Sequence, residues 1–163
     1  DAWTFWPFGY VRTGRRHSCW RLRSVIVLDT GGLYAFLDAD DSNHDLARGV
    51  VEKLRGPFIL SPFVLAELDY LVHTRLGRRA EHELLDDVND GVYTLVEFGR
   101  EDLGHAAQVI RRYPDLDLGI ADASVVVLAA KFRCLDVLGT DQRHFRAIAP
   151  LHGGDAFRLL ADL

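Results

Sequence analysis

Several features that define specialised classes of protein are missing from this chain of 163 residues. It has no methionine and only two cysteines, Cys19 and Cys134, with no Cys-x-x-Cys pair or Cys/His cluster that would suggest zinc. Two cysteines cannot build a disulfide framework, so we expect a reducing, cytoplasmic compartment. No apolar run reaches the roughly 18 to 20 residues that a membrane-spanning helix needs, and we expect no membrane partner.

An excess of positive charge is also lacking. The chain carries 19 basic and 24 acidic side chains, a formal net charge of −5, which argues against a protein that coats nucleic acid. Residues 1–24 hold five of the basic residues and one of the acidic ones, so the remainder has 14 basic and 23 acidic residues, a net charge of −9. A carboxylate-rich domain of this kind is suited to collecting a metal cation.

Residues 1–24 differ from the rest of the sequence. They contain all three tryptophans and show neither the two-residue period of a strand nor the 3.6-residue period of a helix. The first well-patterned segment opens at Val25. We therefore expect a single domain over residues 25–163, with residues 1–24 as an N-terminal extension outside the fold.

From Val25 onward, short apolar runs alternate with helical patterns. The runs at 25–28, 58–60, 93–96 and 137–138 are typical of buried parallel strands, and 157–160 is a possible fifth. The first helical pattern ends at Leu37. The others cover 44–54, 62–76, 78–89, 101–113 and 120–132. This alternation predicts an α/β fold of three layers, α/β/α, with a central parallel sheet.

Four acidic residues occupy positions where such a fold builds a site. Sites in open parallel sheets form beyond the carboxyl ends of the strands, and Asp29 and Asp141 each follow a predicted strand. Glu67 interrupts the apolar stripe of its helix, which predicts a carboxylate facing the core. Asp122 stands at the start of the most apolar helix. Taken singly, each acid also fits an ordinary role in a turn, on the surface or in the first turn of a helix.

Together the four acids indicate a specific chemistry. Converging carboxylates repel one another and cannot all stay ionised without a cation. Oxygen ligands with no histidine or cysteine among them favour Mg²⁺, or Mn²⁺ as a substitute, over zinc. Such ions polarise a phosphoryl oxygen and lower the pKa of a bound water, as hydrolysis of a phosphodiester requires.

Four segments, in order, then carry a resemblance to a known family: VIVLDTGGLYAFLD, SPFVLAELDYL, LGIADASVVVLAAK and VLGTDQRHF. They resemble the PIN domain of VapC-type toxins from bacterial toxin–antitoxin pairs, and the similarity runs from Val25 nearly to the C-terminus. The Arg-rich residues 1–24 depart from this pattern, because such toxins usually begin just before the first strand. The resemblance implies a Mg²⁺-dependent endoribonuclease that cleaves structured RNA, either tRNA or ribosomal RNA, with metal-activated water.

The resemblance also assigns residues and partners. It implies that Asp29, Glu67, Asp122 and Asp141 are catalytic, with Asp29 and Asp122 as metal ligands. Thr30 and Thr140 would support these acids. Independently of the resemblance, Asp115 and Asp117 precede the helix of Asp122, and either could support or replace one of the acids. A cognate VapB-type antitoxin and a homodimer are implied as partners.

Other polar and apolar groups are less specific. Five basic side chains are either solvated on the surface or bind RNA phosphates: Arg75, Arg78, Arg79, Arg143 and Arg146. His144 is expected at the surface or against RNA, and the acids between residues 38 and 45 in a solvated loop. Part of one apolar set could form a groove for a partner helix, although at least half should pack in the core: Leu33, Tyr34, Phe36, Leu37, Leu65, Leu68 and Tyr70.

Three other classes share parts of this pattern. The Asp-Thr-Gly at residues 29–31 matches pepsin-like proteases, but their fold is almost wholly β. A phosphoacceptor receiver domain would need a lysine after a late strand, and the only lysines, Lys53 and Lys131, lie in helical patterns. A PIN fold that binds a partner without catalysis stays open as the alternative function, although all four acids are present.

Overall fold

A computed structural model of the chain describes residues 3–4, 11–12, 25–54, 56–159 and 162. Most of the predicted extension lies outside these residues. Within it, strands β1 (Trp3–Thr4) and β2 (Val11–Arg12) pair antiparallel with each other and form a sheet separate from the central one. In the described part of the chain, no helix combines the length and the hydropathy needed to cross a membrane.

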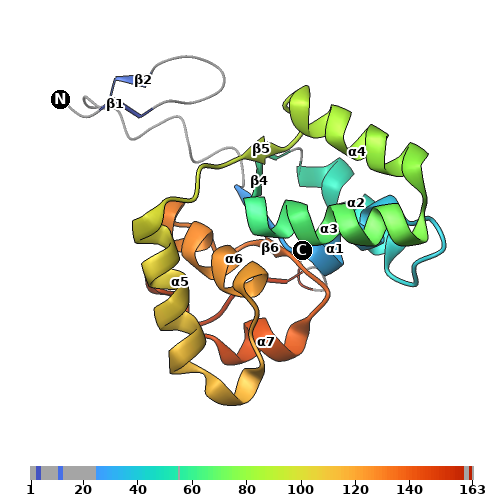
Figure 1. Ribbon diagram of the computed structural model, residues 1–163. Helices are drawn as coiled ribbons and strands as arrows, with labels where there is room; N and C mark the ends of the chain where they lie inside the picture. The colour runs from blue at the N-terminus through green and yellow to red at the C-terminus, as the bar shows by residue number, and fades with distance from the viewer. Residues whose placement is uncertain (1–2, 5–10, 13–24, 55, 160–161, 163) are drawn as a thin grey trace.

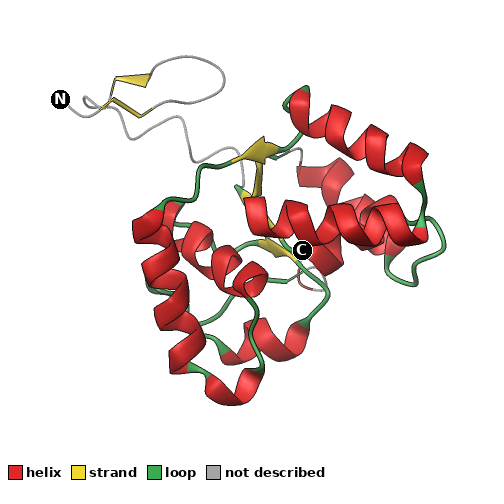
Figure 2. Cartoon of the chain, viewed as in Figure 1, coloured by secondary structure: helices red, strands yellow, loops and turns green. Residues whose placement is uncertain are grey.

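A four-stranded parallel sheet lies at the centre of the domain, with strand order β5-β4-β3-β6 (Figure 2). Strand β3 (Ile26–Leu28) lies between β4 (Phe58–Leu60) and β6 (Val137–Leu138), and β5 (Thr94–Leu95) forms one edge. All three residues of β3 are fully buried, as expected for a continuous apolar run between two neighbours. The predicted parallel sheet is confirmed.

The possible fifth strand at 157–160 is reduced to a single bridge. Arg158 pairs in parallel with Asp136, just before β6, while Phe157 and Leu159 turn into the core. Because β6 itself has only two residues, it offers this segment little ladder to extend. Leu160, the end of the predicted strand, lies outside the described residues.

Seven α-helices of the described chain flank the sheet, as Figure 1 shows, with α5, α6 and α7 on one side and α1 to α4 on the other. The first begins one residue after Asp29 and includes the two glycines that the sequence placed before it. The last, after Asp141, was not predicted. Their bounds are α1 Thr30–Leu37, α2 His44–Leu54, α3 Pro62–Arg75, α4 Arg78–Asn89, α5 Arg100–Arg112, α6 Ile120–Lys131 and α7 Gln142–Ala147.

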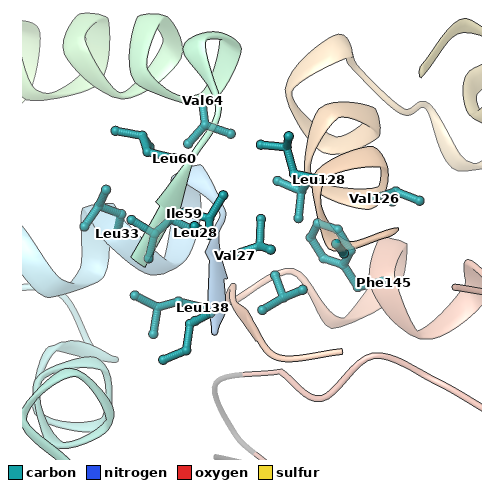
Figure 3. Packing of buried hydrophobic residues seen from close by; sticks show 14 of the residues in the cluster. Val27, Leu28, Leu33, Ile59, Leu60, Val64, Val126, Leu128, Leu138 and Phe145 are labelled. Atoms are coloured by element: carbon teal, nitrogen blue, oxygen red, sulfur yellow. The ribbon is translucent and has the colours of Figure 1, made fainter. Parts of the chain in front are cut away.

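The hydrophobic core joins the sheet to both helical layers. Figure 3 shows Val27 and Leu28 of the central strand between Leu33 and Val64 on one side and Leu128 on the other. Helix α6 is buried at every position of 123–129, which confirms its predicted central place. Its first turn is less buried and carries Asp122, so the core fixes the helix while leaving that carboxylate accessible.

Candidate active site

Asp29 lies at the carboxyl end of the central strand and is only 6% exposed. Its backbone N–H donates to the Leu138 carbonyl of the neighbouring strand at 3.0 Å, and the residue caps the start of α1. Burial raises the pKa of its carboxyl to about 7, and the negative charges of Asp122 and Glu67 add to the effect, against the opposing backbone N–H groups of Gly31 and Thr30. Asp29 is therefore a buried acid with two other acids near it.

Two glycines allow the chain to pass close to this acid. A Cβ on Gly32 would collide with the backbone carbonyl of Leu138, and one on Gly31 would collide with the Thr140 hydroxyl. A Cβ on Gly139 would lie 3.3 Å from Asp29 Oδ2. The absence of side chains here lets α1 begin directly against β6, with the Thr140 hydroxyl and the Asp29 carboxylate both close to Gly31.

Glu67 does not face the core, so that prediction is wrong. The buried face of α3 runs through Val64, Leu68 and Val72, and Glu67 lies beside this line as an exposed residue. Its carboxylate accepts a hydrogen bond of 2.5 Å from the Thr30 hydroxyl. Thr30 follows Asp29 in the chain, so this bond ties the acid of α3 to the end of the central strand.

A buried pair of serines connects the two helices that carry Glu67 and Asp122. Ser61 caps α3, accepting the Phe63 N–H, and its hydroxyl lies 2.6 Å from the hydroxyl of Ser124 on α6. Both serines are fully buried. Since buried hydroxyls need partners, this contact fixes how the N-terminal ends of α3 and α6 meet.

Asp122 and Asp141 lie on either side of a histidine. Asp122 Oδ2 accepts the Gly119 N–H at 2.9 Å, and Asp141 Oδ1 accepts the His144 N–H at 3.1 Å as the cap of α7. The ring nitrogen Nδ1 of His144 lies 3.2 Å from Asp141 Oδ2 and 3.5 Å from Asp122 Oδ1. The sequence assigned His144 to the surface or to RNA. Its position three residues after an acid that caps a helix is the signal that could have placed it here.

The four acids do not form one tight group. In the described part of the chain, no three His, Cys, Asp or Glu side chains are close enough together to hold a metal ion. The charges of Asp122 and Glu67 raise the pKa of Asp29, whereas Asp141 is linked to Asp122 by the ring of His144, which lies near both. The donor chemistry still fits a hard cation, because the neighbouring negative charges that raise the pKa of Asp29 are charges that a cation would offset.

The other predicted polar residues are spread more widely. Asp115 and Asp117 are exposed around the 3₁₀-helix η2 (Pro114–Leu116), where Asp117 adopts a left-handed conformation with φ of 50°. Neither forms a hydrogen bond with the four acids within the described residues. The acids between residues 38 and 45 form a partly to fully exposed loop and helix start, as expected.

The predicted RNA-binding arginines have varied surroundings. Arg75 lies over the ring of Tyr34, 5.5 Å from its centroid. Arg79 pairs with Glu83 at 2.9 Å and Arg146 with Asp162 at 2.8 Å. Arg78 and Arg143 are exposed, at the start of α4 and on α7.

The apolar residues suggested for a partner groove mostly pack inside the domain. Leu33, Tyr34 and Leu68 are buried, and Phe36, Leu37 and Leu65 pack against the core. Tyr70, at 67% exposure, is the member of this set that stays at the surface.

Comparison with known proteins decides the family. A model of the PIN domain matches residues 26–150. The chain belongs to the PIN-domain family. Ribonuclease VapC26 of Mycobacterium tuberculosis is 38% identical over 129 residues, which cover 79% of this chain and 96% of the relative. The resemblance to VapC-type PIN domains is thereby confirmed.

Solved structures of VapC proteins share this PIN fold. The crystal structure of M. tuberculosis VapC20, described as a sarcin–ricin loop cleaving toxin, has a TM-score of 0.69 at 21% identity and covers 78% of this chain and 98% of its own. The crystal structure of VapBC2 from Rickettsia felis, bound to a DNA fragment from its promoter, has a TM-score of 0.59 at 16% identity and covers 78% and 95%. At sequence identities of 21% and 16%, the similarity shows a shared fold alone.

Proposed function

We propose that this PIN domain is a Mg²⁺-dependent endoribonuclease toxin that cleaves structured RNA. The observation that carries the proposal is Asp29, buried at the carboxyl end of β3 with its pKa raised to about 7 by burial and by the charges of two other acids. A protein tolerates such a costly arrangement when a bound cation relieves the repulsion. The similarity to Ribonuclease VapC26 supports the same activity.

The residues of the site have distinct roles in this proposal. Asp29 and Asp122 would hold the ion, with Asp141 beside them. Mg²⁺ supplies a Lewis acid for a phosphoryl oxygen and lowers the pKa of water. Glu67, which accepts a hydrogen bond from the Thr30 hydroxyl, would accept a proton from the attacking water. Water would attack the phosphorus in line with the 3′-oxygen, so that the P–O3′ bond breaks and leaves a 5′-phosphate and a 3′-hydroxyl.

The charge of the protein shapes how it meets RNA. The carboxylates of the site repel the phosphates of RNA, so RNA binding needs positively charged side chains near them. Arg143 is exposed two residues after Asp141, and Arg78 is exposed at the junction of α3 and α4. Phosphate contacts from such side chains position an RNA, whereas its sequence is read from unstacked bases in loops. We infer that the substrate is a loop of tRNA or of large-subunit ribosomal RNA.

A nuclease assay with matched variants tests this function. The wild type should cleave RNA in Mg²⁺ and not in EDTA, leaving 5′-phosphate ends. Asp29→Asn should abolish cleavage, while Asp86→Asn, which removes an exposed acid of α4, should leave it unchanged. A wild type without activity in Mg²⁺ would favour the alternative, a PIN fold that only binds a partner. New 5′ ends mapped in cells would show whether tRNA or ribosomal RNA is cut.

We further propose that a VapB-type antitoxin controls this nuclease and that the toxin forms a homodimer. A partner with an Arg or Lys side chain could pair with carboxylates of the site through charge-assisted hydrogen bonds. Co-purification with the product of the adjacent gene should yield a complex with reduced cleavage. Light scattering of the purified toxin should give twice the mass of one chain. A monomeric mass would refute the homodimer, and an adjacent product that does not bind would refute the antitoxin.

A further inference from the structure

His144 is the shared neighbour of two carboxylates in the candidate active site. It lies in the first turn of α7 with its side chain only 17% exposed. Its Nδ1 lies 3.2 Å from Asp141 Oδ2 and 3.5 Å from Asp122 Oδ1. This nitrogen is buried and completes no hydrogen bond within the described residues. A buried polar atom facing two acceptors without a finished bond requires an explanation.

The remaining oxygens of both acids show what the ring can do. The Gly119 N–H fixes Oδ2 of Asp122, and the backbone N–H of His144 fixes Oδ1 of Asp141. Each carboxylate is thus held on one side by the start of a helix, and its other oxygen faces the same ring nitrogen. An unprotonated Nδ1 would direct its lone pair at both oxygens, whereas an Nδ1–H attracts both.

We propose that His144 is a positioning residue whose Nδ1–H is a donor shared by Asp122 and Asp141. It orients the two carboxylate oxygens that the helix starts leave free, and so prepares them for the cation. This role rests on the proposed function, in which these acids serve Mg²⁺-dependent cleavage. Groups that orient metal-binding side chains in this way affect metal affinity by about 10- to 100-fold when they are replaced.

Two variants of nearly equal shape test the donor. His144→Asn keeps an amide group close to the position of Nδ1, whereas His144→Leu fills the same space without a donor. Mn²⁺ is the probe, and its binding is followed by electron paramagnetic resonance in the absence of RNA. We expect His144→Leu to weaken Mn²⁺ binding by about tenfold or more, and His144→Asn to recover most of the loss. The Mg²⁺ concentration for half-maximal cleavage should rise in parallel.

The outcomes separate this role from others. Wild-type affinity in His144→Leu would overturn the proposal. Equal weakness of the two variants would also overturn it, because the ring itself would then be required, either as a ligand or for packing, and thermal unfolding would tell which. A wild type that binds Mn²⁺ but cleaves no RNA contradicts the proposed function alone, and the Mn²⁺ affinities still decide the role of His144.

Discussion

Asp29→Asn should make the cation-free protein more stable than the wild type, by an amount that increases as the pH rises from 4 to 8. The pKa of Asp29 is raised from 3.8 to about 7, so its ionised form is unfavourable in the folded state. The folded state therefore holds this proton more tightly than the unfolded chain. The resulting stabilisation is complete below about pH 4 and is lost as the pH rises through 7. Asparagine has a similar shape and carries no charge to penalise.

The size of the effect follows from the two pKa values. One unit of pKa shift corresponds to about 1.36 kcal/mol, so the ionised carboxylate costs about 4 kcal/mol at pH 8. At pH 5 less than half of this penalty has developed, because the folded protein still holds the proton. The advantage of Asp29→Asn over the wild type should thus grow by about 2–3 kcal/mol between pH 5 and pH 8.

Urea unfolding of both proteins in EDTA, at each pH from 5 to 8, measures this difference. Asp86→Asn serves as the control and should show no such trend, since that acid is exposed. Mg²⁺ added at pH 8 should stabilise the wild type more than Asp29→Asn and narrow the gap. A stability difference that stays constant from pH 5 to pH 8 would refute the reasoning that Asp29 is a strained, buried acid.

Three further substitutions test the surroundings of the site. Gly32→Ala should destabilise the protein by about 1–3 kcal/mol, because its Cβ would collide with the backbone of β6. Gly49→Ala, with open space around it, should instead stabilise the protein by up to about 1 kcal/mol. Urea unfolding measures both variants, and equal effects would contradict the close approach of α1 to β6. Ser124→Ala should cost about 1–3 kcal/mol by removing the buried hydrogen bond between the Ser124 and Ser61 hydroxyls, and an unchanged midpoint of unfolding would count against that bond. Arg143→Ala should weaken RNA binding and lower the slope of log affinity against log salt by about 1, with the fold unchanged; an unaltered slope would remove this residue from the RNA surface.

The sheet and most helices could be predicted because their signals are local. The Ser61-Pro62 start of α3 and the bounds 78–89 of α4 agree with the structure, since capping residues and Gly77 mark them in the sequence itself. The start of α1 could not be predicted in this way. Two glycines in succession disfavour a helix by local propensity, but they are needed where the helix crosses the Leu138 carbonyl, which is distant in the sequence.

The candidate site shows the same division between local and distant information. Strand ends placed Asp29 and Asp141 correctly, because the carboxyl ends of parallel strands share one edge. The direction of the Glu67 side chain was predicted wrongly. Glu67 is next to Leu68 of the buried face of α3, and its hydrogen-bond partner, Thr30, is 37 residues away in the sequence. The contact of His144 with Asp122 depends on how α7 packs against α6, which no periodicity in the sequence records.

The strand order has a consequence for how this protein is made. Strand β3 pairs with β4, about 30 residues later, but its other neighbour β6 begins only at residue 137. A ribosome must therefore synthesise more than 100 residues beyond β3 before the central strand can acquire both partners, and pairings over such separations form late in folding. A nascent or prematurely terminated chain that lacks β6 has Asp29 without Asp141 and without the neighbouring strand that helps to bury Asp29. Under the proposed function, a truncated product that lacks β6 would consequently have no complete active site.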